Sequence, residues 1–180
     1  ALAEAEVEYA DKTSPAITVA FPVEAKSGLD FVRRFGARML AAAGDKSVEL
    51  FLPIWTTTPW TLPSNLAISV NPDMDYQLLV RPSEGSALQV VVVAVALAED
   101  LAKRMQVDAF SSTANHSESF KGSELKGLAA KHPWLNRRSP ILLGAHVTAD
   151  AGTGLVHTAP DHGVDDFDVV AFHNHSLPEL

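Results

Sequence analysis

Two polar segments carry the side chains that could bind or transform a small ligand. The first, residues 55–65, has the sequence WTTTPWTLPSN and separates two apolar runs. Pro59 and Pro63 lack a backbone donor and favour extended geometry at Thr58 and Leu62, so we expect no regular ladder to continue through this segment. Hydroxyls that alternate between faces, beside two flat indoles, suit a ligand with polar and apolar parts. An edge strand broken by proline, with no chemistry, explains the same composition equally well.

The second segment brings imidazoles and carboxylates together within ten residues, at His157, Asp161, His162, Asp165 and Asp166. A metal site is one alternative, but the two histidines are separated by a proline-containing turn, which is not the spacing of a zinc-binding helix, and the chain has no cysteine. A serine hydrolase is another alternative, although the sequence has no Gly-x-Ser-x-Gly motif. From the residues alone, the two adjacent aspartates can simply complement a helix dipole, and the histidines can occupy ordinary turn positions.

Together, the two segments resemble the editing domain, connective peptide 1, of isoleucyl-tRNA synthetases of the bacterial or organellar type. Residues 55–65 are similar to the threonine-rich peptide of that domain, and residues 150–166, DAGTGLVHTAPDHGVDD, are similar to the other half of its pocket. The two matches occur in the family's order about ninety residues apart, and residues 5–15, AEVEYADKTSP, resemble the family's opening strand. Valyl and leucyl relatives usually carry an Arg-Pro pair after their threonines. This chain has Thr58-Pro59-Trp60 there, which favours the isoleucyl branch.

The resemblance implies roles for individual residues. His157 matches the pocket histidine of the family, and Asp166 matches the carboxylate that takes the α-ammonium group of the substrate, while Asp165 and His162 receive no role. The threonines match residues around the substrate and the 3′-terminal adenosine, Trp60 is expected to shape the pocket, and Asn65 matches a residue linked to editing. The implied catalytic residues are Thr57, Thr58, Asn65, His157 and Asp166, the implied substrate-binding residues are Thr56, Thr57, Thr58, Trp60, His157 and Asp166, and no metal ligand is implied.

Two residues of the second segment depart from the family's pattern. Asp161 stands where many relatives have glycine, and Phe167 stands where tyrosine is frequent. We expect Asp161 to alter the conformation and the charge of the local loop.

The activity that the resemblance implies is post-transfer editing. A pocket that accepts isoleucine cannot strongly exclude valine, which is one methylene smaller, and isoleucyl-tRNA synthetases are the standard example of this limit. A second, smaller pocket hydrolyses the ester of valine attached to tRNA(Ile) and rejects the isoleucyl ester by its size. We expect a positioned water to attack without a covalent intermediate, oriented by threonine hydroxyls, backbone groups and the adenosine's own hydroxyl.

The implied partners are the 3′ end of tRNA(Ile) carrying misattached valine and the remainder of the synthetase, with no membrane. No cofactor is expected for editing, because ATP and magnesium would belong to the synthetic domain. The cytoplasm is the expected compartment, with an organellar matrix as the alternative. Three other functions stay open: a non-catalytic module that binds amino acids or adenosine, a metal-dependent hydrolase, and a structural fragment without activity.

Composition and charge indicate a domain that binds nucleic acid weakly by itself. The chain has 180 residues, of which 47% are hydrophobic and 20% charged, which predicts a single domain over residues 1–180. The formal charge of −8 argues against a free-standing tRNA binder, whereas a domain that receives only the 3′ end needs few phosphate contacts. No apolar run reaches the roughly 20 residues of a membrane span. The start without methionine and the abrupt end are what an insertion excised from a larger enzyme would show.

Hydrophobic periodicity predicts the elements that position the two segments. Alternating patterns indicate paired strands at residues 1–9 and 17–21, and one amphipathic helix is expected from a capping box at Ser27 to a stop at Gly44. Further strands are expected at residues 48–57, 66–70, 76–80, 88–95, 141–147 and 155–158, and further helices at residues 96–105 and from residue 164.

Apolar runs and turn residues also indicate the structure of the rest of the chain. The apolar run Val90–Val93 is expected in the core, residues 107–136 are expected to form a surface excursion, and Gly152 and Gly154 mark a turn. The fold class is therefore mixed α+β and β-rich with peripheral helices. The family resemblance sharpens this to a β-barrel-like core.

Overall fold

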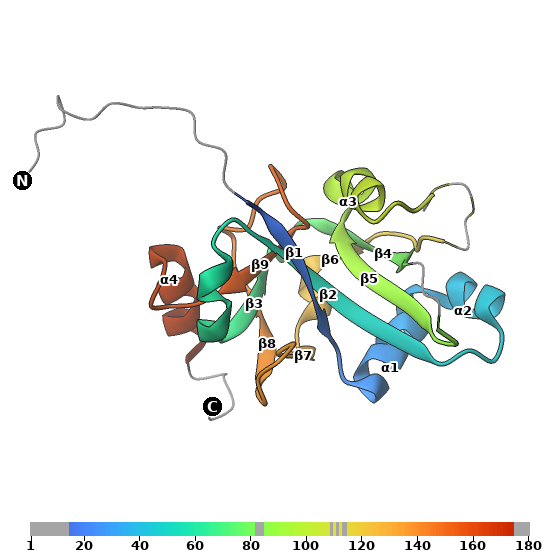
Figure 1. Cartoon of the computed structure of the whole chain (residues 1–180), viewed down its shortest axis with the longest axis horizontal. Coiled ribbons are helices and arrows are strands. Elements are labelled where there is room, and N and C mark those ends of the chain that lie inside the picture. The colour runs from blue at the N-terminus through green and yellow to red at the C-terminus, as the bar shows by residue number, and fades with distance from the viewer. Residues whose placement is uncertain (1–14, 82–84, 109, 111, 113–114, 175–180) are drawn as a thin grey trace, which may run out of the picture.

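The computed structural model describes residues 15–81, 85–108, 110, 112 and 115–174, and within them the strands form two sheets (Figure 1). The first sheet has five strands in the order β1-β2-β5-β4-β6, and the second has four strands in the order β7-β8-β3-β9. The strand expected at residues 1–9 lies outside the described residues. The bounds are β1 (Ile17–Pro22), β2 (Val48–Thr56), β3 (Ala67–Val70), β4 (Asp75–Arg81), β5 (Leu88–Ala94), β6 (Phe120–Lys121), β7 (Ala129–Lys131), β8 (Arg138–Leu143) and β9 (Leu155–Thr158).

The first sheet has a fully buried centre and carries the chain to the first polar segment. β2 and β5 run parallel, with β1 antiparallel to β2 and β4 antiparallel to β5. The side chains of Val90–Val93 are at most 1% exposed, which confirms the prediction from their continuous apolar sequence. β2 ends at Thr56, which pairs with Ile17 at the start of β1. The threonines therefore emerge at the end of a rigid central strand.

The second sheet brings the two polar segments together. β3 lies between β8 and β9, parallel to the former and antiparallel to the latter. In this register Ala67 pairs with Thr158 and Ile68 pairs with His157. The start of β3 thus lies beside the end of β9. The segment that precedes β3 and the segment that follows β9 therefore meet at one edge of the sheet, although they lie about ninety residues apart in the sequence.

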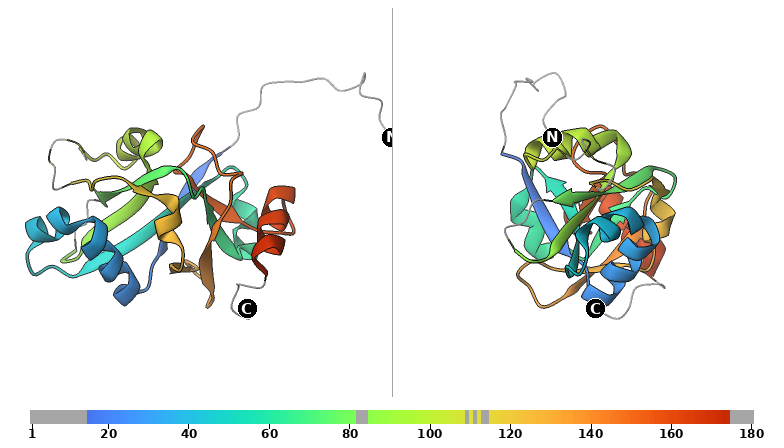
Figure 2. Two further views of the ribbon diagram at one scale, coloured as in Figure 1. Left: turned by 180° about the vertical axis from the view of Figure 1, so that it is seen from behind. Right: turned by 90° about the vertical axis from the view of Figure 1, so that its right-hand side faces the viewer.

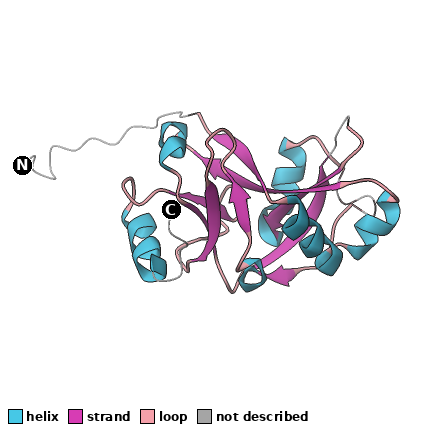
Figure 3. Cartoon of the chain, turned by 90° about the horizontal axis from the view of Figure 1, so that it is seen from below, coloured by secondary structure: helices cyan, strands magenta, loops and turns pink. Residues whose placement is uncertain are grey.

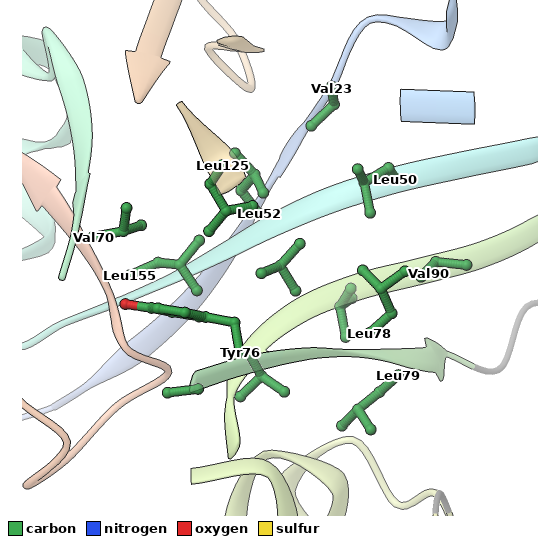
Figure 4. Close-up of a cluster of buried hydrophobic side chains, with 14 of the residues drawn as sticks. Val23, Leu50, Leu52, Val70, Tyr76, Leu78, Leu79, Val90, Leu125 and Leu155 are labelled. Carbon is green, nitrogen blue, oxygen red and sulfur yellow. The ribbon is translucent and has the colours of Figure 1, made fainter. Parts of the chain in front are cut away.

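One hydrophobic core joins the two sheets. Figure 4 shows Leu50 and Leu52 from the first sheet in the same cluster as Val70 and Leu155 from the second. Tyr76 lies within this cluster, fully buried, and its hydroxyl donates to Gly154 O at 2.7 Å. Burial raises the pKa of this hydroxyl to about 12, so it remains a donor at all physiological pH values. The core therefore also fixes the backbone that leads into β9.

Helices cover the outside of the sheets, with α4 and α2 at opposite ends of the molecule (Figures 1 and 2). The strands run through the middle in Figure 3. None of the helices in the described part of the chain has the length and apolar character to cross a membrane. The helices are α1 (Ala25–Phe35), α2 (Ala37–Ala43), α3 (Ala98–Arg104) and α4 (Val164–His173), with 3₁₀ helices η2 (Pro59–Ser64), η3 (Val95–Leu97) and η4 (Gly122–Leu125).

The single helix predicted between Ser27 and Gly44 is wrong in its start and its continuity. α1 begins at Ala25 without a side-chain cap, so Ser27 is not a capping residue. The backbone leaves helical geometry at Gly36, with φ −122° and ψ 31°, and α2 follows. A Cβ at Gly36 would lie 3.1 Å from Leu78 Cδ1, so the break coincides with a close approach of the backbone to the sheet. The expected stop at Gly44, with φ 63°, is confirmed.

The β-rich mixed fold is confirmed, but two details of the prediction are corrected. The described strands form two separate sheets and do not close into a barrel. Residues 107–136 are more than a surface excursion, because β6 extends the first sheet, β7 extends the second, and Leu125 between them is fully buried. These pieces have two to four residues each, which is too short for hydrophobic periodicity to reveal.

Candidate functional site

The first polar segment folds into a tight turn and the 3₁₀ helix η2 directly after β2. Thr58 precedes Pro59 with an extended φ of −124°, and its carbonyl accepts hydrogen bonds from both Thr61 N at 3.0 Å and Thr61 Oγ1 at 2.9 Å. The expected extended geometry at Leu62 is wrong, because Leu62 lies inside η2. A helix this short loses only one internal hydrogen bond to Pro63, so the proline does not prevent it.

The turn between β7 and β8 holds η2 in place. His132 Nε2 donates to Leu62 O at 3.0 Å, and Arg137 donates to Pro63 O. His132 is buried, and this burial lowers the pKa of its imidazole, which keeps the ring neutral with Nδ1 free to accept from Leu135 N at 3.1 Å. The apparent excursion therefore contributes directly to the geometry of the threonine segment.

A turn with two glycines at positive φ leads into β9. Gly152 and Gly154 have φ values of 87° and 77°, which residues with a side chain rarely adopt. A Cβ at Gly154 would lie 2.4 Å from Ala94 Cβ, so only glycine fits there. Thr153 between them donates to Pro53 O at 2.6 Å. The turn is thus tied to β2 and places His157 three residues later on β9.

His157 is held by hydrogen bonds on both ring nitrogens. Asn65 Nδ2 lies 2.7 Å from Ala67 O and 2.8 Å from His157 Nδ1, and His157 Nε2 lies 2.9 Å from Thr61 Oγ1. A carbonyl only accepts, so the group facing Ala67 O is the amide NH₂, and its second hydrogen is donated to His157 Nδ1. The proton of a neutral His157 therefore sits on Nε2 and is donated to Thr61.

The environment of His157 favours the neutral ring. Burial lowers the pKa of His157 to about 4, and repulsion by His132, His162 and Arg137 contributes in the same direction. The side chain is 7% exposed. With both nitrogens engaged and the pKa well below neutrality, this imidazole is a fixed wall of the site and a poor general base.

Asp166 lies in the first turn of α4, which begins after Gly163. One carboxylate oxygen, Oδ2, accepts from Ala159 N at 2.9 Å, and the other has no hydrogen-bond partner among the described residues. Partial burial raises the pKa of Asp166, whereas the bond from Ala159 and the nearby His146 lower it. A cation beside the unbonded oxygen would complete the environment of this carboxylate.

A cavity of about 610 Å³ lies between these elements. Thr56 and His157 are almost fully buried in its wall, Asp166 is half-buried, and Thr57 and Thr58 are exposed. Trp60 is 69% exposed. The cavity is lined by every residue expected to bind substrate, namely Thr56, Thr57, Thr58, Trp60, His157 and Asp166, and also by His162 and Asp165. Asn65 is the exception among the expected site residues, because it is fully buried behind His157 and contacts the cavity only through that ring.

Other lining residues received no role from the sequence. Thr61 lies within residues 55–65, one turn of a 3₁₀ helix after Thr58. This spacing could have identified Thr61 as a residue on the same side of the segment as Thr58. His146, Thr148 and Asp150 also line the cavity, in the irregular stretch between β8 and β9. The strand predicted at residues 141–147 is wrong at its end, because β8 ends at Leu143 and His146 lies in the turn that follows. Asp161, which departs from the family's pattern, is exposed and does not line the cavity.

Two further observations bear on chemistry. No three His, Cys, Asp or Glu side chains in the described ranges gather closely enough to hold a metal ion. A second cavity of about 510 Å³, on the outer side of the first sheet, is lined by Thr18, Arg81, Arg104 and apolar residues, and none of the expected site residues reaches it.

The chain resembles known proteins in sequence along nearly its whole length, although no protein-family model matches it. It is 52% identical to the isoleucine–tRNA ligase of Alcanivorax borkumensis over 167 residues, which are 93% of the chain and 16% of that ligase. It is 47% identical to the isoleucine–tRNA ligase of Geobacillus thermodenitrificans over 180 residues, which are 100% of the chain and 17% of the ligase. The chain thus spans about one sixth of the length of the curated relatives it matches.

Solved structures give the fold independently. The chain is similar to the editing domain of the cytosolic leucyl-tRNA synthetase of P. knowlesi, with a TM-score of 0.69 and 15% identity over 91% of this chain and 63% of that one. It is also similar to the corresponding domain of P. falciparum, with a TM-score of 0.63 and 16% identity over 90% of this chain and 68% of that one. By sequence the chain belongs to the isoleucine–tRNA ligase family, and it has the fold of a synthetase editing domain.

Proposed function

We propose that the 610 Å³ cavity is an editing pocket in which the ester of valine misattached to tRNA(Ile) is hydrolysed, while correctly charged Ile-tRNA is rejected by its size. The observation that carries this proposal is the convergence of the threonine segment, His157 and Asp166 on one cavity. Its volume is within the range of about 300–1,000 Å³ that is typical of small-molecule sites. Membership of the isoleucine–tRNA ligase family supports aminoacyl-tRNA as the substrate class.

Asp166 is the proposed partner of the α-ammonium group. Its Oδ2 is fixed by the Ala159 backbone, so the other oxygen is oriented and available to the ligand. Burial disfavours the charged carboxylate, and a bound ammonium group restores it. A charge-assisted hydrogen bond of this kind gives both affinity and orientation.

Hydrolysis is assigned to a water positioned by hydroxyls. Thr57 and Thr58 are exposed at the cavity, and Thr56 Oγ1 lies 3.3 Å from Thr58 Oγ1 and accepts from Thr58 N at 3.0 Å. These bonds hold the turn in which the hydroxyls are presented. Because both nitrogens of His157 are engaged, the proton of the water is not assigned to this histidine. The free hydroxyl of the terminal adenosine relays this proton to the ribose oxygen of the breaking ester bond, which leaves as a hydroxyl. Asn65 acts through His157 and is a positioning residue in this scheme.

The wider assignments follow from the family. We place residues 1–180 in one editing domain that works within the larger ligase, with the 3′ end of tRNA(Ile) and the rest of the ligase as its partners. No cofactor is assigned to the editing step, and the cytoplasm is the proposed compartment, with an organellar matrix as the alternative. The charge of −8 fits a domain to which other parts of the enzyme present the tRNA.

The test is a deacylation assay of the full ligase with Val-tRNA(Ile) and Ile-tRNA(Ile), with and without a chelator. We expect rapid loss of valine, slow loss of isoleucine, and no effect of chelation. Loss of activity on chelation and its recovery with zinc would favour the metal-dependent hydrolase. Stable Val-tRNA, together with heat of binding for a non-hydrolysable valyl-adenosine mimic, would indicate a binding module, and neither hydrolysis nor binding would indicate a structural fragment.

A further inference from the structure

Ser139 is a buried polar residue that connects β8, on the far side of β3 from His157, to the proposed pocket. It lies on β8, is fully buried, and its hydroxyl is 2.5 Å from Asn65 Oδ1. One residue separates Asn65 from β3, which lies between β8 and β9. Asn65 therefore spans from Ser139 on one neighbouring strand to His157 on the other.

The hydrogen bonds around Asn65 form one directed chain. Because the amide NH₂ faces Ala67 O, its oxygen faces Ser139, which must donate. The chain then runs from Asn65 to His157 Nδ1, from His157 Nε2 to Thr61 Oγ1, and from Thr61 Oγ1 to Thr58 O. Every donor in it has an acceptor. A rotation of the imidazole by 180° would break both of its bonds.

We propose that Ser139 and Thr61 are positioning residues for this pocket. Together with Asn65, they hold His157 in one tautomer and one ring plane, so that it forms a rigid wall against the larger side chain. This inference rests on the proposed editing function and deepens it. Because both ring nitrogens are bound to the protein, the surface left for the ligand is carbon, and selectivity depends on where that surface is held.

Ser139 and Thr61, at the two ends of this hydrogen-bond chain, act in different ways. Loss of the Ser139 hydroxyl leaves the buried oxygen of Asn65 without a donor, and loss of the Thr61 hydroxyl leaves the Nε2 proton of His157 without an acceptor. In both cases the ring gains alternative orientations. A wall that can move affects the isoleucyl ester more than the valyl ester, because only the larger side chain requires the extra space.

The first test measures the tautomer of His157 directly, by nitrogen-15 NMR of the 180-residue chain. The wild type should show the Nε2–H tautomer alone at neutral pH. Ser139→Ala and Thr61→Val should each add a second tautomer or average the two nitrogen shifts, whereas Thr61→Ser, which keeps the hydroxyl, should retain the wild-type signals.

Ser69 provides the matched control. Ser69 is also fully buried in the second sheet, and its hydroxyl lies 2.7 Å from Thr158 Oγ1. Thr158 follows His157 in the sequence, but neither Ser69 nor Thr158 belongs to the hydrogen-bond chain described above. Ser69→Ala should lose comparable stability and leave the His157 signals unchanged. The proposal is overturned if Ser139→Ala and Thr61→Val leave the tautomer unchanged, or if Ser69→Ala perturbs it as strongly.

The second test places the same variants in the full ligase. The rate of Ile-tRNA(Ile) hydrolysis relative to Val-tRNA(Ile) should rise about three- to ten-fold in Ser139→Ala and Thr61→Val, as expected for the loss of one neutral hydrogen bond. Thr61→Ser and Ser69→Ala should keep the wild-type ratio. An unchanged ratio in variants whose tautomer is mixed refutes the positioning role while the editing function stands. A wild-type ligase that leaves Val-tRNA intact refutes the editing function, and the NMR result still decides whether Ser139 and Thr61 position His157.

Discussion

The cavity has two walls of different construction. His157 projects from β9 within the second sheet, is 7% exposed, and is bound at both nitrogens by residues that are themselves buried. Asp166 projects from α4, which contributes only Val169 to the buried core and leaves Val164 and Phe172 about four-fifths exposed. One wall is part of a sheet, and the other is on a helix at the end of the molecule (Figure 1).

The difference fits the roles proposed for the two walls. Exclusion by size requires a surface that does not yield by a fraction of an ångström, and a buried, fully hydrogen-bonded ring provides it. Recognition of an ammonium group depends on a charge with an oriented oxygen, which tolerates a more exposed support. The burial also moves the two pKa values in opposite directions, that of His157 down and that of Asp166 up.

The largest expected effect is on the pH dependence of stability. His157 has a pKa of about 4 in the folded chain and 6.5 in the unfolded chain, so between these values the unfolded state binds more protons. Its contribution is complete above pH 6.5 and is lost as the pH falls through 4, a change of about 3 kcal/mol in the free energy of unfolding. Asp166 has the opposite sign, because its raised pKa favours the folded state at low pH.

The measurement is urea unfolding between pH 4 and 7, comparing the wild type with His157→Gln, which removes the titrating group but keeps hydrogen-bonding capacity. The variant should lose most of the slope. His132, whose pKa is also lowered by burial, should leave a smaller slope of the same sign. Equal slopes in the two proteins would mean that His157 is not held neutral by its surroundings.

The second prediction removes the rigid wall. His157→Ala in the full ligase should admit isoleucine and raise the ratio of Ile-tRNA to Val-tRNA hydrolysis by roughly 10- to 200-fold, the range over which one methylene is usually discriminated. The assay is deacylation of the two purified aminoacyl-tRNAs. If Ile-tRNA is cleaved no faster than by the wild type, His157 does not form the wall.

The third prediction removes the charged wall. Asp166→Ala should weaken binding of a valyl-adenosine mimic by roughly 10- to more than 100-fold, because a hydrogen bond to a charged group contributes about 1.5–3 kcal/mol. Isothermal titration calorimetry gives this loss. The variant should show little further loss when the ligand's amino group is replaced by hydroxyl.

Asp165 is the internal control for that experiment. It neighbours Asp166 in the first turn of α4 and also lines the cavity. Asp165→Ala should keep the wild-type preference for the amine over the hydroxyl, which completes a double-mutant cycle with the ligand as one partner. An equal preference for the amine in wild type and Asp166→Ala would return Asp166 to a role in the helix N-terminus.

The sequence revealed local patterns and motif positions, but not the features that depend on tertiary packing. Strands with clear periodicity, such as residues 48–56 and 88–94, were predicted close to their bounds, and motif positions led to the residues that line the cavity. The division of the strands into two sheets and the split of the helix were not predicted. Both depend on tertiary packing: which strands pair with one another, and how closely Gly36 approaches Leu78. Ser139 gave no signal, since a lone serine in an apolar strand does not disclose its partner in another segment.

The smallest effect is expected at Trp60, which the family resemblance implies shapes the pocket together with His157. Its side chain is 69% exposed, so it lies at the mouth of the cavity without the packing that would hold it against a ligand. Trp60→Ala should therefore change the ratio of Ile-tRNA to Val-tRNA hydrolysis by less than about three-fold, in line with the small effects of exposed substitutions. The same deacylation assay measures it, with His157→Ala as the reference. A change as large as that of His157→Ala would show that the exposed indole becomes ordered on the bound substrate, and that size exclusion does not require a wall built into the sheet.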